Sequence, residues 1–320
     1  VQTCALPIFS QAEVRIFMQQ YQLSDHELAL WLQYIEYEIG FILPRVQWHW
    51  VKTVIERQLR LHQLSSTELL SQMVDNTPLY HQLLDDILIP RTQFFRHLPT
   101  FEFVAAYAQH WQQHVYENVD TAHLPLTLPT LNAWSAGCAS GQEAVSIALT
   151  LHEMLGDCTR FMVYGSDFHQ QALASAKQGC YGIRERDFIP QNYHRQLRPM
   201  DERKFGLAAH LQARLHYFSK NLVDEKQPMP LAKGQCQLIM CKNVLIYFRQ
   251  FEQRDVVRFL SRYLADDGVL LLGAGQTTMV HEPTLLKLPL GTINGYCKRA
   301  APLWLRRLVQ LDNRCQTPMA

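Results

Sequence analysis

The 320-residue chain has almost no net charge, because 30 lysines and arginines balance 29 aspartates and glutamates. That balance argues against a global field that would recruit nucleic acid or an anionic membrane surface. No stretch approaches the ~18 consecutive apolar residues of a membrane-spanning helix, and the first residues lack the basic-then-apolar layout of a signal peptide. We therefore expect a cytoplasmic protein that inserts in no membrane and binds no nucleic acid.

Paired cysteine motifs are also missing. The eight cysteines form no C-x-x-C pair and have no histidine at metal-ligand spacing, so we expect no metal site and interpret the thiols as buried and reduced. What is present is 48% hydrophobic and 18% charged residues, the composition of a globular protein with a large core. Val1–Ile8 resemble a translated sequencing adaptor and are excluded from the fold prediction.

The first part of the chain shows only helical periodicity. Apolar residues recur at helical spacing from Gln11 to Asp86, with start signals at Ser24 and Ser65 and breaks at Gly40 and Pro44. A further helical pattern covers Phe101–Val115. We predict an all-helical domain over residues 9–88.

The pattern changes after the proline-containing segment "HLPLTLPT", since short apolar runs then alternate with helical stretches. The predicted strands are Leu131–Ser135, Phe161–Ser166, Gln237–Cys241 and Val269–Gly273, and the predicted helices are Gln142–Leu155, His169–Gln178 and Phe251–Leu264. This alternation predicts an α/β domain with a parallel sheet over residues 89–302, followed by a tail, 303–320. The segment "LQARLHYFS" alternates in polarity, which predicts a strand of a small antiparallel insertion over 187–220.

Two glycines mark the first strand-to-helix turn of this α/β domain. "WSAGCASGQEAVSIAL" places Gly137 and Gly141 where the backbone of an open parallel sheet approaches a ligand. The turn has neither the G-x-G-x-x-G of a dinucleotide site nor the spacing of a phosphate loop. Glu143 stands in the first helical turn, where a carboxylate is an awkward neighbour for phosphate. The turn therefore favours a cationic ligand.

A second acid follows the next strand. Asp167 ends "YGSD", where a carboxylate can accept hydrogen bonds from both ribose hydroxyls of a nucleoside. A nucleoside with positive charge and no phosphate describes S-adenosylmethionine. Taken singly, Glu143 could merely complement the helix dipole and Asp167 merely cap the next helix. Together, at the ends of successive strands, they favour the nucleoside.

Four blocks in order resemble the CheR-type chemotaxis protein-glutamate O-methyltransferases. They are "RTQFFRHLPTF" (Arg91–Phe101), "WSAGCASGQEAVSIAL", "YGSDFHQQALASAKQGCYG" (Tyr164–Gly182) and "CKNVLIYF" (Cys241–Phe248). The similarity extends into the helical part, Tyr37–Leu70, and to "INGYCKR" (Ile293–Arg299). The resemblance implies a helical receptor-facing domain and a Rossmann-like S-adenosylmethionine-dependent methyltransferase domain with a small antiparallel insertion. It also implies methylation of glutamates on the cytoplasmic helical bundle of methyl-accepting chemoreceptors, with S-adenosylhomocysteine as product, by a monomer.

The resemblance also assigns roles to residues. Arg96 and Tyr247 would serve the reacting centre, while Thr92 and Arg96 would contact the cofactor. The other cofactor contacts would be Gly137, Glu143 at the methionine part, Asp167 at the ribose, Asn221 and Leu222 at the adenine, and Asn243 and Val244 along its length. Phe94 and Phe95 are interpreted as core packing.

Several positions depart from the family pattern. Gln142, Ala144 and Val145 replace a Glu, a Pro and a Tyr of the first cofactor block, Pro90 replaces an asparagine, and Lys242 replaces an arginine. They leave open an alternative in which the chain is a catalytically weakened cofactor-binding module of a chemosensory system. A methyltransferase for nucleic acid or a small molecule is disfavoured because a basic stripe is absent.

A basic set on one predicted helix, Lys52, Arg57 and Arg60, is a candidate docking surface for an acidic receptor bundle. The same residues fit ordinary solvated positions of an amphipathic helix, and both interpretations remain open.

Overall fold

The computed structural model describes residues 20–75, 77–88, 92–117, 129–156, 160–273 and 282–308. The chain divides into two compact units, Val1–Ile89 and Pro90–Ala320. Val1–Ile8, Pro90 and the part of the predicted tail after residue 308 lie outside the described residues.

The first unit is all-helical where it is described, as predicted. Its helices are α2 (Asp25–Ile39), α3 (Arg45–His62), α4 (Ser66–Asp75) and α5 (Thr77–Ile87). The predicted start at Ser24 is a capping box, since Ser24 Oγ accepts from Glu27 N at 3.3 Å while Ser24 N donates to Glu27 Oε2 at 2.9 Å. Gly40 ends α2 with a φ of 74°, a backbone conformation that glycine adopts at little cost.

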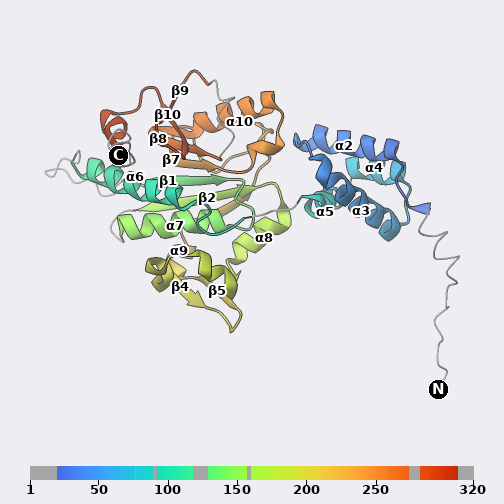
Figure 1. The fold of residues 1–320 in the computed structure, drawn as a ribbon, viewed down its shortest axis with the longest axis horizontal. Coiled ribbons are helices and arrows are strands. Elements are labelled where there is room, and N and C mark those ends of the chain that lie inside the picture. The colour runs from blue at the N-terminus through green and yellow to red at the C-terminus, as the bar shows by residue number, and fades with distance from the viewer. Residues whose placement is uncertain are drawn as a thin grey trace, which may run out of the picture. The chain divides into compact units, whose positions relative to one another are not determined.

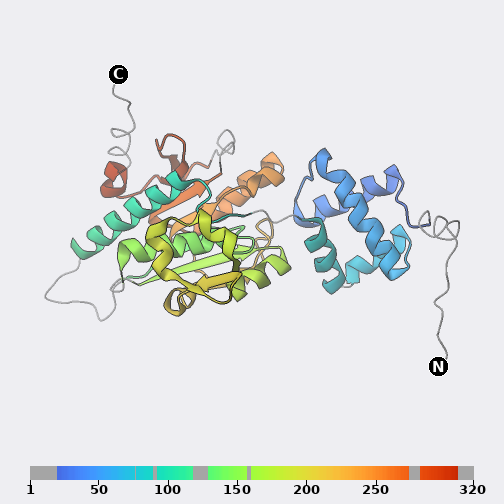
Figure 2. The same ribbon diagram turned by 60° about the horizontal axis from the view of Figure 1, so that its bottom comes forward.

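All four helices of this unit contribute buried residues to its core, and α5 packs against both α3 and α4 (Figure 2). Trp31 and Ile35 of α2 and Val54 and Ile55 of α3 are buried. Arg57 of α3 is ion-paired with Asp86 of α5 at 2.6 Å, so part of its charge is already neutralised within the unit.

The second unit contains a seven-stranded sheet of order β6-β2-β1-β7-β8-β10-β9 (Figure 1). Its strands are β1 (Leu131–Ala136), β2 (Phe161–Asp167), β6 (Leu215–Ser219), β7 (Cys236–Cys241), β8 (Leu264–Leu272), β9 (Leu285–Lys287) and β10 (Asn294–Lys298). The five neighbouring strands from β6 to β8 in this order run parallel. β10 pairs antiparallel with β8, and β9 pairs antiparallel with β10. The predicted α/β architecture is therefore confirmed.

Helices cover both faces of this sheet (Figure 1). The second unit contains α6 (Leu98–Glu117), α7 (Gln142–Leu155), α8 (Gln170–Gln178) and α10 (Gln250–Tyr263). Ala133 shares a core with Ile147 of α7, whereas the adjacent Trp134 packs edge-on against Phe259 and Tyr263 of α10. Successive strand side chains point to opposite faces, so α7 and α10 lie on opposite sides. Among the helices described, none is both long enough and apolar enough to cross a membrane.

A three-stranded antiparallel sheet, of order β3-β5-β4, forms the insertion (Figure 2). It comprises β3 (Tyr181–Gly182), β4 (Leu197–Pro199) and β5 (Lys204–Leu207), with the 3-10 helices η2 (Ile183–Phe188) and η3 (Gln191–Gln196) and the short helix α9 (Ala209–Gln212). One prediction is wrong in its partner: Leu215–Ser219 of "LQARLHYFS" is β6, which pairs parallel with β2 in the main sheet. Alternating polarity predicts a strand but does not identify its neighbour.

Candidate functional site

The predicted site residues of the second unit cluster at one edge of the main sheet. Gly137 follows β1, Asp167 ends β2, Asn221 follows β6 and Asn243 follows β7. These four strands are neighbours and parallel, so their carboxyl ends meet at the same edge. The connections run outward in opposite directions from β1 and β7, and this switch point is where open α/β sheets bind ligands.

The turn after β1 is built around Gly137. Its φ is +85°, and a Cβ there would lie 2.2 Å from Cγ2 of Val244. Gly137 N and Cys138 N both donate to Ser166 O, at 2.8 and 2.9 Å. The absence of a side chain therefore lets the turn lie directly against the loop after β7, and it brings together two of the predicted cofactor residues.

Asp167 joins this turn to the start of α8. Its Oδ2 accepts from Ala139 N at 2.7 Å and its Oδ1 accepts from His169 N at 2.9 Å. Burial raises the pKa of the Asp167 carboxyl, and the backbone donors His169 and Ala139 oppose that shift. Asp167 does not cap α8, because the N-cap is His169, whose side chain accepts from Ala172 N. Each carboxylate oxygen of Asp167 can accept more than one hydrogen bond. The same group can still receive a ribose hydroxyl.

Glu143, in the first turn of α7, forms the second carboxylate of the site. Its Oε1 accepts from Ser135 Oγ at 2.7 Å. Burial raises the pKa of Glu143, and the positive charges of Lys242 and Arg96 act in the opposite direction. Ser135 was not singled out from the sequence, because a serine within a buried strand carries no local signal of a carboxylate partner.

Lys242 connects the end of β7 to the segment that carries Arg96. Its ammonium donates to Thr100 Oγ1 at 3.0 Å and to Arg96 O at 3.4 Å. Burial lowers the pKa of Lys242, while Glu143 favours its charged form. Arg96 itself is exposed. The charges of both the Arg96 guanidinium and the Lys242 ammonium act on Glu143. Thr92 is partly buried, and the described contacts do not connect it with the other predicted residues.

Strained backbone is concentrated in these segments. Within the described chain, non-glycine residues with positive φ include Phe95 at 48°, His97 at 68°, Ala139 at 47° and Asn243 at 62°. Such conformations cost roughly 1–3 kcal/mol each and persist where surrounding structure imposes them, commonly at ligand sites. Asn243 lies beside Val244, one wall of the Gly137 turn.

The aromatic residues around this edge divide into packing and candidate contacts. Phe95 stacks on Tyr193 with ring centroids 4.9 Å apart, and Phe94 packs edge-on against Tyr181. Both phenylalanines are buried, which confirms the prediction that they are core residues. Tyr247 ends the short 3-10 helix η4 (Leu245–Tyr247), three residues after Val244, and is only partly buried.

Gln142, a departure from the family pattern, has a defined place. It is 6% exposed; its Nε2 donates to Glu185 Oε2 at 2.9 Å, and its Oε1 accepts from Ser140 Oγ at 2.8 Å. Its backbone O accepts from Ser146 Oγ at 2.7 Å. The amide thus joins the glycine turn to η2 of the insertion, where a glutamate would face the carboxylate of Glu185.

The loop after β6 contains the predicted adenine-side residues. Leu222 is buried, and Asn221 Oδ1 accepts from Val223 N at 3.2 Å. Asn221 N donates to Gln227 Oε1 at 2.8 Å, so the loop closes on itself.

These features fit a cationic nucleoside. The two carboxylates, Glu143 and Asp167, flank the turn at Gly137, which lies directly against the loop after β7, and neither suits a phosphate group. The two acceptor carboxylates therefore agree with S-adenosylmethionine as the ligand.

The chain is similar in sequence to known methyltransferases. Residues 90–290, more than half of the chain, match the family model described as CheR methyltransferase, SAM binding domain. A chemotaxis protein methyltransferase of Salmonella typhimurium is 27% identical over 293 residues, which cover 88% of this chain and 95% of that protein. Cher3, a methyltransferase of Pseudomonas putida, is 26% identical over 258 residues, covering 79% of this chain and 89% of its own. Among solved structures, a TehB-like SAM-dependent methyltransferase of Corynebacterium glutamicum has a TM-score of 0.35 and 13% identity, covering 61% of this chain and 99% of that one. This chain belongs to the CheR methyltransferase family and is an S-adenosylmethionine-dependent methyltransferase.

Proposed function

We propose that the chain transfers the methyl group of S-adenosylmethionine to glutamate side chains of methyl-accepting chemoreceptors, forming the methyl esters used in sensory adaptation. The observation that carries the proposal is the convergence of Gly137, Glu143 and Asp167 at one sheet edge, inside the region that matches the family model. The name of the Salmonella typhimurium relative, a chemotaxis protein methyltransferase, supports the receptor substrate.

On the cofactor side, Asp167 receives the ribose hydroxyls and Glu143 balances the positive charge of the methionine part. Asn221 and Leu222 border the adenine, and Asn243 and Val244 line the cofactor between the two ends, with Thr92 at its periphery. When bound, S-adenosylmethionine supplies an electrophilic methyl group on a sulfonium centre.

On the substrate side, the enzyme has little acid-base chemistry to perform. A glutamate side chain, with an ordinary pKa of ~4.3, is already an oxyanion at neutral pH and needs no strong base. Arg96 holds and orients the incoming carboxylate through its guanidinium, and Lys242 adds positive charge beside it. Tyr247 lines the path of the transferred methyl. The main contributions are alignment and exclusion of water.

The first unit provides the docking surface for the receptor. Receptor cytoplasmic bundles are helical and acidic, and Lys52 and Arg60 on α3 offer complementary charge. Arg57 contributes less because Asp86 already pairs with it. The enzyme acts as a cytoplasmic monomer.

The test is transfer of labelled methyl from S-adenosylmethionine to receptor-containing membranes of the source organism, measured as base-labile ester. Calorimetry with S-adenosylhomocysteine is run on the same wild-type preparation and on Asp167→Ala. We expect ester formation and binding by wild type, with both lost in the variant. Binding without ester on any receptor would instead support the cofactor-binding module, and absence of wild-type binding would contradict both functions.

A further inference from the structure

Lys220 is a buried charged residue for which the proposed reaction has no use. It follows β6 directly, its exposed fraction is 1%, and it is among the largest fully buried side chains described. Charged side chains are rarely buried to this degree unless they are paired or hydrogen-bonded. Among the described residues it forms no ion pair with a carboxylate, so backbone groups satisfy the ammonium instead.

The Lys220 ammonium lies across the loop after β6. Its Nζ donates to the carbonyl oxygens of Asp224 and Gln227, the latter at 3.2 Å. It also lies 4.8 Å from the ring centroid of Phe259 on α10, a cation-π contact. The Lys220 side chain therefore binds two carbonyl groups of the loop and packs against α10.

The same loop is attached to the ribose-side acid. Lys220 N donates to Asp167 O at 3.0 Å. Gln227 completes the closure, because its Oε1 accepts from Asn221 N at 2.8 Å and its Nε2 donates to Ser219 O at 3.3 Å. Asn221 and Leu222, the proposed adenine-side residues, lie inside the closed segment, residues 220–227.

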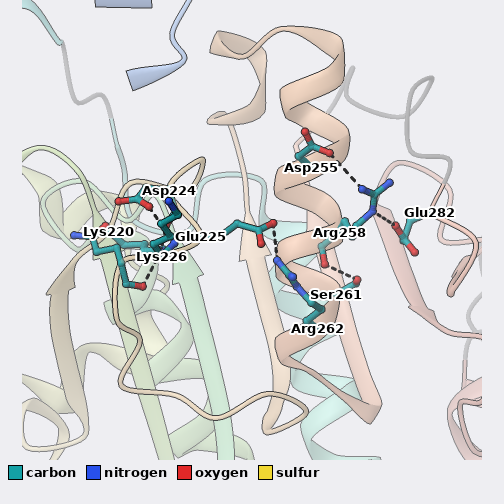
Figure 3. A network of polar contacts seen from close by, with 10 residues as sticks. Lys220, Asp224, Glu225, Lys226, Asp255, Arg258, Ser261, Arg262 and Glu282 are labelled. Carbon is teal, nitrogen blue, oxygen red and sulfur yellow. Dashed lines mark hydrogen bonds and ion pairs between the residues drawn. The ribbon is translucent and has the colours of Figure 1, made fainter. Parts of the chain in front are cut away.

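A second, weaker attachment comes from α10. Glu225 points away from the loop toward Arg262, and their ion pair measures 2.6 Å (Figure 3). These side chains are 47% and 36% exposed, and ion pairs at such exposure contribute little. The loop thus has one buried and one solvent-exposed attachment, which can be removed separately.

From these contacts we infer that Lys220 is a positioning residue that shapes loop 220–227 as the adenine-binding wall of the cofactor site. The inference rests on the cofactor site proposed above. Lys220 touches neither the cofactor nor the substrate; it acts by fixing two carbonyl groups, which leaves Asn221 and Leu222 in place. An apolar residue of similar length fills the same volume but leaves both carbonyls without their donor, so the loop opens.

The test compares Lys220→Met and Lys220→Gln with wild type in the full chain, using calorimetry with S-adenosylhomocysteine and with adenosine. We expect Lys220→Met to weaken both ligands by about tenfold or more, because two charge-assisted hydrogen bonds are lost. Lys220→Gln, which keeps an N–H donor, recovers part of the affinity. The KM for S-adenosylmethionine rises, while kcat at saturating cofactor changes little.

The matched control is Glu225→Gln, which removes the exposed attachment of the same loop. We expect less than about a fivefold change in affinity. Hydrogen exchange of amides 221–227 provides a local readout, with faster exchange in Lys220→Met than in Glu225→Gln even where the melting temperatures of the two variants agree.

Unchanged binding of both ligands by a folded Lys220→Met overturns the inference, as does a fall in kcat without loss of adenosine affinity. Failure of wild type to bind either ligand overturns the cofactor site as well as the inference. Normal wild-type binding with an unaffected variant overturns the role of Lys220 alone.

Discussion

At the scale of single residues, Gly137 shows how a missing side chain can build a site. Two penalties act on any substitution there, the positive φ of +85° and the 2.2 Å approach of a new Cβ to Val244. Gly234 also has a positive φ, +74°, but a Cβ there meets nothing within 4 Å. The pair separates backbone strain from steric exclusion.

We expect Gly137→Ala to lower the affinity for S-adenosylhomocysteine by about tenfold or more, because the turn must move away from the loop after β7. Gly234→Ala should carry only the strain, roughly 1–2 kcal/mol of stability, with normal binding. Calorimetry and thermal melting measure the two effects. Equal losses of affinity in both variants would contradict the steric explanation.

Glu143, a proposed cofactor contact, is expected to have opposite effects on binding and on stability. Its raised pKa means that the folded state holds the proton more tightly than the unfolded state, so ionised Glu143 is destabilising above its ordinary value of 4.5. The penalty grows as the pH rises through the raised folded pKa and is absent when both states are protonated. Glutamine keeps the acceptor for Ser135 without the charge.

We therefore expect Glu143→Gln to raise the melting temperature at neutral pH, with the difference vanishing below the ordinary pKa. Affinity for S-adenosylmethionine should fall by about tenfold, because the positive charge of the cofactor loses its counter-charge. Melting curves across pH and calorimetry test both. A variant that melts lower than wild type at neutral pH would show that the carboxylate is stabilising.

At the scale of elements, the glycine turn is held by side chains that link it to neighbouring segments. Gln142 bonds Glu185 of η2, and Ser146 of α7 receives a hydrogen bond from Phe95 N at 3.0 Å. The start of α7 thus joins three segments, which are the glycine turn, the segment before Arg96 and η2 of the insertion. The amide at 142 accounts for one departure from the family pattern, because it pairs with an acid without repulsion.

We expect Gln142→Glu to weaken binding of S-adenosylhomocysteine several-fold at neutral pH, because two carboxylates would meet in a buried place. The double variant Gln142→Glu with Glu185→Gln exchanges the partners and should recover most of the affinity. A double-mutant cycle by calorimetry measures the coupling. Strictly additive losses would show that the contact does not control the turn.

At the scale of the whole molecule, the two compact units divide the proposed tasks. All proposed cofactor contacts lie in the second unit, whereas the candidate receptor-facing charges lie on α3 of the first. Lys52 and Arg60 are partly exposed, and Arg57, although exposed, is ion-paired with Asp86. Substitutions on α3 should therefore weaken binding of the receptor and leave binding of the cofactor unchanged.

We expect Lys52→Glu with Arg60→Glu to raise the KM for receptor by about tenfold at low salt, since rim charges act mainly on association. Affinity for S-adenosylhomocysteine should remain that of wild type. Methylation kinetics at two ionic strengths check the first expectation and calorimetry checks the second. A salt-independent loss would indicate damage to the first unit.

Much of the architecture could be predicted from local pattern. The capping box at Ser24, the glycine that ends α2 and the strand-helix alternation after residue 130 are short-range signals, and they fixed element type and the parallel sheet. The pairing of Leu215–Ser219 could not be predicted, because period-2 alternation is the same in either sheet. The burial of Lys220, one residue later, could not be predicted either, because its partners are backbone carbonyls of the folded loop.

The sequence by itself determined the helical first part, the strand-helix alternation of the second part and, through Glu143, Asp167 and the glycine turn, a predicted preference for a cationic nucleoside over phosphate. Only the tertiary structure decided which partners those groups take: Ser135 for Glu143, Val244 for Gly137, Glu185 for Gln142, and two loop carbonyls for Lys220. Local propensity depends on neighbours along the chain. Contacts between loops from different strands depend on strand order, which only the packed sheet provides.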